Sequence, residues 1–151
     1  MLSAIAIQIQ NIVNEVISAD IDNIDWESKS SPGKWSAKQI IGHLTDSAMI
    51  NLQRFVRCTY EENFRLTYEQ DEWVAAQHYQ EADITDLLTL WRALNMQISR
   101  ILYDYPADRV MAKCDNSKTE PALHTVASLA EDYVRHMEHH ISQINLKTLK
   151  I

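Results

Sequence analysis

The sequence predicts an all-α protein, a four-helix bundle with two long connections between its helices. The chain of 151 residues contains only two glycines and three prolines. A sheet protein of this length normally needs more of both residues in its turns. Apolar residues recur at every third or fourth position in several long stretches, as they do in amphipathic helices. Because 46% of the residues are hydrophobic, we expect residues 1–151 to form a single domain with one core.

The first helix is predicted over residues 2–19. Three isoleucines near its start alternate as they would in a strand, but the apolar residues after them follow the helical period. No turn signal separates the two parts, so we interpret them as one amphipathic helix. Residues 20–34 are rich in Asp, Asn and Ser and close with Pro32-Gly33, which indicates a loop.

The second helix is predicted to begin after Ser36 and to run to about residue 60. Ser36 and Gln39 have the spacing of a capping box, in which each side chain bonds to the other residue's backbone N–H. Trp35 stands at the position of a hydrophobic staple. One side of this helix carries Ile40, His43, Leu44, Ser47, Ile50, Asn51 and Arg54.

Long polar connections separate the remaining helices. Residues 61–83 predict a crossover with a short helical piece, and a third helix follows from about Thr85 to Leu102. Residues 106–122 predict the second long connection. The last helix is predicted from Thr125, as its N-cap, to Lys147. Connections of this length argue against a simple up-down-up-down bundle.

Composition excludes several classes of function. The formal charge of −7 argues against a nucleic-acid-binding protein, which needs clustered Lys and Arg. No run of about 18 apolar residues occurs and the N-terminus lacks the basic region of a signal peptide, so no membrane segment is expected. Cys58 and Cys114 are too few for a disulfide framework, and they lack a Cys-x-x-Cys spacing or a neighbouring histidine. We expect a cytoplasmic protein whose cysteines are not nucleophiles.

Half of the six histidines lie within positions 136–140. His136 and His140 are four residues apart, which places them on the same face of a helix. That face also carries an apolar stripe formed by Leu129, Tyr133, Met137 and Ile144. Two inward imidazoles need partners in the interior, and a divalent metal ion is one such partner. Hydrogen bonding within the core is the alternative.

His43 could supply a third imidazole from the second helix. Three neutral imidazoles from two facing helices make a metal site with open positions for water or substrate. The His-Glu-x-x-His pattern of zinc proteases is absent, and Glu138 lies about 200° round the helix from both His136 and His140. Glu138 therefore cannot be their general base, and no catalytic residue is assigned.

Asp46, Asn51 and Arg54 are candidates for supporting roles. Asp46 lies one turn after His43 and could accept a hydrogen bond from its ring. A solvated or capping carboxylate is the alternative. Asn51 and Arg54 could bind substrate, or could pair with neighbouring acids. The other histidines are predicted at the surface: His78, His124 and His139.

Two segments resemble the signatures of the DinB-like family, most closely its YfiT-like branch. The first runs from Pro32 to Ser47 and is followed by Asn51 and Arg54. The second runs from Tyr133 to Ile144 and contains the His-x-x-x-His pair. Residues 59–124 match the family only loosely.

The resemblance implies an up-down-down-up four-helix bundle, often a homodimer, that binds nickel or zinc. It implies that His43, His136 and His140 are the metal ligands. Some members are thiol S-transferases that use low-molecular-weight thiols such as bacillithiol or mycothiol, and others are described as metal-dependent hydrolases. We therefore expect a metal-dependent enzyme that transfers a thiol to an electrophilic small molecule, or hydrolyses a small substrate. The alternative is a non-catalytic, stress-related metal-binding protein in which the metal only staples two helices.

Overall fold

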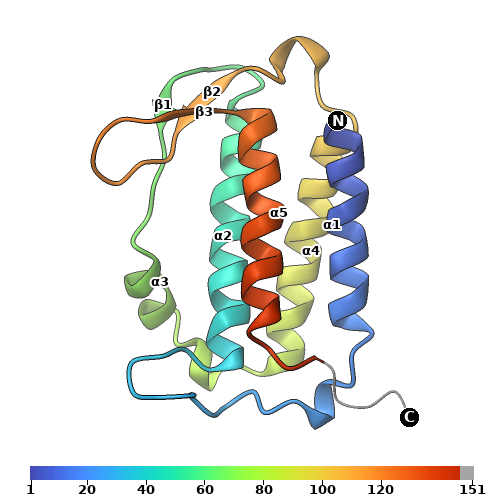
Figure 1. The fold of residues 1–151 in the computed structure, drawn as a ribbon, viewed down its shortest axis with the longest axis vertical. Helices are drawn as coiled ribbons and strands as arrows, with labels where there is room; N and C mark the ends of the chain where they lie inside the picture. The colour runs from blue at the N-terminus through green and yellow to red at the C-terminus, as the bar shows by residue number, and fades with distance from the viewer. Residues whose placement is uncertain (147–151) are drawn as a thin grey trace.

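Four long helices form a bundle in the computed structural model, which describes residues 1–146. They are α1 (Leu2–Ile17), α2 (Ala37–Arg57), α4 (Ile84–Tyr103) and α5 (Val126–Ser142). α1 packs against α4 and α5, and α2 packs against the same two helices. Figure 1 shows that α1 and α5 run in one direction and that α2 and α4 run in the other. The predicted up-down-down-up four-helix bundle is therefore confirmed.

The buried faces of these helices make the core. In α1, Ile5 and Ile9 are buried and Ile7 is 48% exposed. Ile5 and Ile9 are four residues apart and share one face of the helix, so the isoleucines that alternate as in a strand are part of α1. Each large apolar side chain contributes about 1.5–3 kcal/mol when fully buried. Among the largest are Trp91, Phe55, Ile9, Ile41, Leu44, Ile98, Leu102 and Met137. Within the part of the chain that the structure describes, no helix combines the length and apolar character needed to cross a membrane.

The predicted N-terminal caps of α2 and α5 are confirmed. Oγ of Ser36 accepts a hydrogen bond from the Gln39 N–H at 3.1 Å, and the Gln39 side chain accepts one from the Ser36 N–H at 3.0 Å. Thr125 caps α5, where its side chain accepts a hydrogen bond from the Ser128 N–H at 3.1 Å. These bonds satisfy backbone donors that a helix terminus otherwise leaves unpaired.

The end of α5 differs from the sequence prediction. The helix ends at Ser142, whereas the prediction extended it to residue 147, which lies outside the described residues. Ile144 continues the apolar stripe and is buried, but its N–H bonds to the Ile141 carbonyl three residues back. The chain therefore leaves the helix in a tight turn while still burying an apolar side chain, and the periodic pattern hides the end of the helix. α2 likewise ends slightly early, at Arg57 rather than near residue 60.

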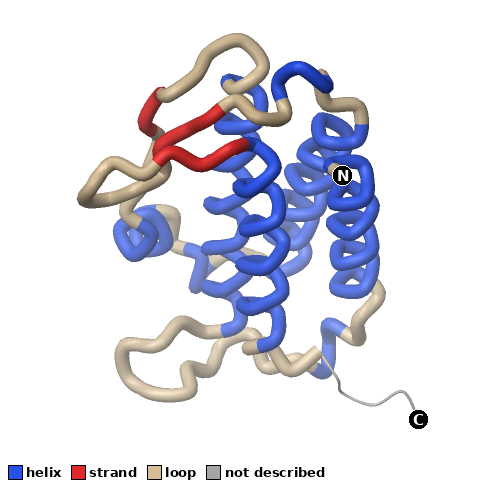
Figure 2. Tube along the Cα trace, turned by 45° about the horizontal axis from the view of Figure 1, so that its top comes forward, coloured by secondary structure: helices blue, strands red, loops and turns tan. Residues whose placement is uncertain are grey.

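A small sheet that the sequence did not predict joins the two long connections. Its strands are β1 (Phe64–Arg65), β2 (Lys113–Asp115) and β3 (Leu123–Thr125). β1 pairs with β2 in parallel, and β2 pairs with β3 antiparallel. Figure 2 shows the strands together at the end of the bundle where α5 begins. Strands of two or three residues are too short to show the alternation from which a strand is recognised.

Short helical pieces complete the connections. α3 (Gln70–Ala76) confirms the predicted helical piece in the first long connection. Three 3-10 turns, η1 (Ile21–Asn23), η2 (Tyr79–Glu81) and η3 (Ala107–Arg109), lie between the longer elements. Of these, η2 packs against α2 and brings Tyr79 next to the turn that carries His43.

Gly42 of α2 makes this close packing possible. A methyl group at Gly42 would lie 2.2 Å from Cδ2 of Tyr79, far inside the contact distance of two carbon atoms. With the ring in this place, the Tyr79 hydroxyl donates a 2.6 Å hydrogen bond to Oδ1 of Asp46. The glycine therefore lets a tyrosine from η2 reach a buried carboxyl group on α2.

Gly42→Ala is expected to destabilise the protein by about 1–3 kcal/mol, the usual cost of overpacking a core. Alanine has a better helix propensity than glycine by up to about 1 kcal/mol, but the displaced Tyr79 ring would lose its bond to Asp46. Urea denaturation measures the effect. In a Tyr79→Ala background the same substitution should become neutral or stabilising, because the obstructing ring is gone. Equal destabilisation in both backgrounds would contradict this explanation.

Candidate metal centre

Three histidines converge where α2 begins and α5 ends. Figure 1 shows that these two helix ends lie at the end of the bundle opposite the sheet. His43 lies in the second turn of α2, and His136 and His140 lie in the last two turns of α5. Nε2 of His43 is 3.0 Å from Nε2 of His136, and one ligand atom from each ring lies within 4.8 Å of the other two. The ring centroids are 4.6–5.0 Å apart. The structure thus brings together the three residues implied as ligands, and metal binding itself stays a prediction.

Burial keeps these imidazoles neutral. It lowers the pKa of His43 to about 3 and the pKa of His136 to about 4, and it also lowers the pKa of His140. Repulsion from the neighbouring rings is the second cause for His43 and His136, because a proton on one ring would lie close to a proton on the next. Neutral imidazoles offer the lone pairs that a metal ion requires.

The donor set fits a divalent transition-metal ion. Three neutral nitrogens suit zinc or nickel, both of which imidazole binds readily. Zinc–nitrogen bonds are about 2.0–2.1 Å, so two nitrogens on one ion lie at most about 4 Å apart. The 3.0 Å pair meets this limit and the 4.8 Å span is slightly larger, within the reach of side-chain adjustment.

Trp35 covers one side of the histidine cluster. Its ring centroid lies 4.8 Å from that of His43 and 6.4 Å from that of His140. Trp35 immediately precedes the N-cap of α2, so the capping box that starts the helix also restricts the position of this ring. The sequence indicated a packing role for Trp35 but gave no sign of its place beside the histidines.

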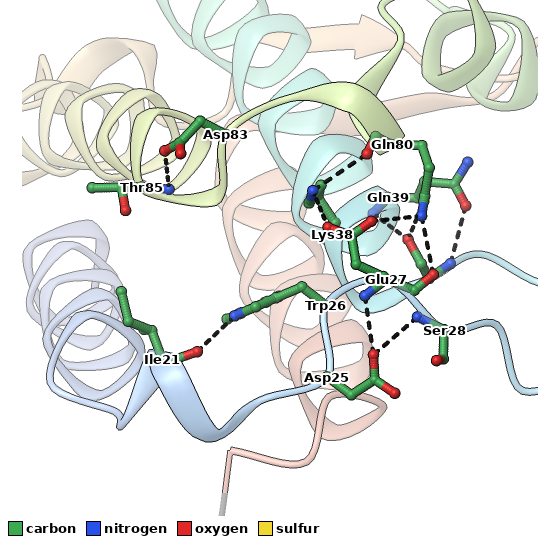
Figure 3. A network of polar contacts seen from close by, with 11 residues as sticks. Ile21, Asp25, Trp26, Glu27, Ser28, Lys38, Gln39, Gln80, Asp83 and Thr85 are labelled. Atoms are coloured by element: carbon green, nitrogen blue, oxygen red, sulfur yellow. Dashed lines mark hydrogen bonds and ion pairs between the residues drawn. The ribbon is translucent and has the colours of Figure 1, made fainter.

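Polar contacts hold the loop that precedes α2 against its first turn (Figure 3). Buried Lys38 pairs with Glu27 of this loop and donates a 3.3 Å hydrogen bond to the Gln80 carbonyl. The Gln80 amide donates to the Glu27 carbonyl at 3.0 Å. Oγ of Ser36 donates to Oε1 of Gln80 at 2.7 Å. These bonds connect the loop, the first turn of α2 and η2, close to Trp35 in the sequence.

Gln143 is a neighbour of the cluster that sequence reasoning missed. Its Oε1 lies 2.9 Å from Nδ1 of His140. A hydrogen bond from Nδ1 to this oxygen leaves Nε2 of His140 as the ring's acceptor atom, which is the arrangement a metal ligand needs. The signal available in the sequence was the spacing, because Gln143 follows His140 by three residues.

Asp46 is buried and bonds to η2 and to the segment before it. Oδ1 accepts hydrogen bonds from the Tyr79 hydroxyl and from the Gln77 side chain. Burial raises the pKa of the Asp46 carboxyl group, against the opposing effect of these bonds. Among residues 1–146, the buried Nδ1 of His43 has no hydrogen-bond partner. The role of Asp46 as an acceptor for His43 stays a prediction.

Other reactive side chains lie outside the cluster. Cys58 and Cys114 are buried free thiols, and burial raises the pKa of both, for Cys58 to about 11. Their thiolate forms are therefore disfavoured at neutral pH. Three histidines are exposed: His78, His124 and His139.

Two cavities border the histidine cluster. The larger has a volume of about 710 Å³ and is lined by His140 and Trp35 together with the loop before α2. The smaller has a volume of about 180 Å³ and is lined by His136 together with Asn51 and Arg54. Gln70, at the start of α3, lines both cavities. The cluster therefore has one cavity at His140 and another at His136.

Comparisons with known proteins agree with this fold. The family model of the DinB superfamily matches residues 17–144. The solved structure of YfiT from Bacillus subtilis matches with a TM-score of 0.79 and 21% identity, covering 95% of this chain and 82% of that chain. That protein is described as a probable metal-dependent hydrolase with an unusual four-helix bundle topology. No protein of curated function matches the sequence.

Proposed function

The chain belongs to the DinB superfamily, and on this premise we propose that it is a metal-dependent enzyme acting on small molecules. His43, His136 and His140 would hold the divalent ion, nickel or zinc. The main support is the convergence of three neutral imidazoles from α2 and α5, with ligand atoms within 4.8 Å of one another. The description of YfiT as a probable metal-dependent hydrolase supports metal dependence as well.

Such a site suits the activation of a nucleophile. Three neutral ligands leave the full charge of a divalent ion, and that charge lowers the pKa of a bound thiol or water toward neutrality. The protein's own part is to keep the rings unprotonated by burial and to orient His140 through Gln143. Trp35 covers His43 on one side and limits the access of water there.

Cavities at two of the three histidines favour a reaction between two substrates. We therefore favour transfer of a low-molecular-weight thiol, such as bacillithiol or mycothiol, to an electrophilic small molecule. With an epoxide, a sulfur–carbon bond would form as a ring carbon–oxygen bond breaks, and the thiol proton would end on that oxygen. Hydrolysis needs only one organic substrate and is the alternative reaction. Following the family resemblance, the enzyme would act in the cytoplasm as a homodimer.

A thiol-consumption assay tests this function. Purified protein loaded with nickel or zinc is incubated with a panel of thiols and with epoxides or haloaromatics, and adducts are identified by mass spectrometry. We expect adducts that require the metal and disappear when a chelator is added. Hydrolysed product formed without any thiol would favour the hydrolase alternative. If metal-loaded protein gives neither product across the panel, the metal is better explained as a structural ion that links α2 to α5.

A further inference from the structure

Arg54 is a buried cation that forms no ion pair with an acidic residue among residues 1–146. Its residue is only 7% exposed. Arginine is almost never buried unless an anion accompanies it. A charge in this position needs either a partner within the protein or one that arrives with a ligand.

Neutral acceptors hold the Arg54 guanidinium in place. Nε and Nη2 donate to the Leu66 carbonyl at 3.1 and 2.6 Å, and Nη1 donates to Oδ1 of Asn51 at 3.2 Å. A guanidinium carries five N–H groups, so these bonds leave part of its donor capacity unused. Carbonyl and amide oxygens fix the orientation of the group but do not cancel its charge.

Arg54 lines the same cavity as His136. Two other charged residues line this cavity, but each already has its own partner. Lys118 pairs with Glu69 at 3.3 Å, and Asp132 pairs with Arg135 at 3.1 Å. The charge of Asp132 also favours the cationic form of Arg54, but Asp132 makes no ion pair with it. Within the described residues, Arg54 therefore has no counter-ion in direct contact.

Building on the function proposed above, we propose that Arg54 binds a carboxylate group of the substrate that occupies the smaller cavity. The planar fork of a guanidinium matches the two oxygens of a carboxylate. One uncompensated positive charge also balances the single negative charge of a carboxylate. A phosphate monoester carries about −1.5 to −2 near neutral pH and would leave an excess of negative charge.

The position of Arg54 also indicates the shape of this substrate. Arg54 on α2 and His136 on α5 line the same cavity, whose volume of about 180 Å³ leaves room only for a short chain between them. A molecule that reaches both places is elongated, with its reacting atom at the histidines and its carboxylate at the other end. The substrate class is therefore a small chain-like carboxylate rather than a compact neutral molecule.

Ligand pairs that differ only in charge test the role of Arg54. The probes are 6-mercaptohexanoate and 6-mercaptohexanamide, and calorimetry measures their dissociation constants with nickel-loaded protein. We expect the acid to bind at least about tenfold more tightly than the amide, as a charge-assisted hydrogen bond allows. Arg54→Gln should remove this preference, and Arg54→Lys should keep only part of it. Arg57→Gln is the matched control, because Arg57 lies on the same helix but pairs with Glu61 outside the cavity.

Each result has a defined meaning. Equal affinities of the acid and the amide for the wild-type protein would overturn the proposal, even if Arg54→Gln failed to fold. An equal loss of affinity for both probes in a folded Arg54→Gln variant would overturn it too. Tighter binding of 6-mercaptohexyl phosphate than of 6-mercaptohexanoate would overturn the carboxylate assignment and indicate a phosphate-bearing substrate. In chelator-treated protein, hexanoate should still bind more tightly than hexanamide. A carboxylate preference found together with no thiol transfer would therefore contradict the proposed function but not the role of Arg54.

Discussion

Replacement of His43, His136 or His140 with alanine is expected to abolish stoichiometric metal binding. The three rings come from two helices, and their ligand atoms lie within 4.8 Å of one another, so removal of any one leaves an incomplete site. Affinity should fall by more than about 100-fold, the upper end of the loss caused when only an outer-shell partner is removed. Elemental analysis of purified variants measures the metal content, and circular dichroism checks that each variant is folded.

His139→Ala is the matched control and should retain the metal. His139 is adjacent to His140 on α5, but it is exposed, and neighbouring positions on a helix diverge by about 100°. His139 is therefore a histidine from the same stretch of α5 that does not face His43. Metal retained by His140→Ala together with metal lost from His139→Ala would reverse the assignment.

Acid is expected to destabilise the metal-free protein progressively as the pH falls below about 6.5. In the unfolded chain His43 and His136 titrate at the ordinary pKa of 6.5, but in the folded protein their pKa values are about 3 and about 4. Between these limits the unfolded state binds more protons, so the free energy of unfolding falls with the pH. Each of the two histidines contributes up to about 1.4 kcal/mol per pH unit across its window.

Urea denaturation in the presence of a chelator, repeated between pH 7 and pH 4, measures this dependence. His43→Gln should flatten the curve, because the variant lacks the histidine with the lower pKa of the two. Asp46 cannot cause this loss of stability in acid. Its raised pKa makes the folded state bind more protons than the unfolded state, so it would increase the free energy of unfolding as the pH falls. A wild-type free energy of unfolding that stays constant from pH 7 to pH 5 would contradict the buried, neutral state of the rings.

The bundle was predictable because its helices are long and amphipathic. Over sixteen or more residues the helical period of the apolar side chains outweighs the strand-like alternation at the start of α1. The Ser36–Gln39 capping box marks the start of α2 without any tertiary information. The sheet could not be predicted in the same way. Its strands are two or three residues long, and they exist because Cys114 lies between Phe64 and His124 in the folded chain. Such pairing depends on where the two connections pass, which local sequence does not encode.

The candidate site likewise has a part that the sequence predicts and a part that it does not. The spacing of His136 and His140 identifies a shared helical face, and the position of His43 on another helix suggests a third imidazole. Trp35 and the two cavities depend on how loops fold over the bundle, so no periodic pattern reveals them. The cation at Arg54 was visible in the sequence as a polar residue on a half-buried face. That it forms no ion pair within the described part of the chain became apparent only in three dimensions.

The separation of the histidines along the chain sets an order of events during translation. His43 and His136 are 93 residues apart, and His136 and His140 lie in the last of the four long helices. A nascent chain on the ribosome exposes α2 first, when it can offer a metal ion only one of the three imidazoles. Capture of an ion by all three imidazoles would therefore have to wait until α5 has emerged and docked, because a domain generally folds as a unit. A metal retained by this protein would thus mark a chain whose synthesis has passed α5 and whose helices have reached their native arrangement.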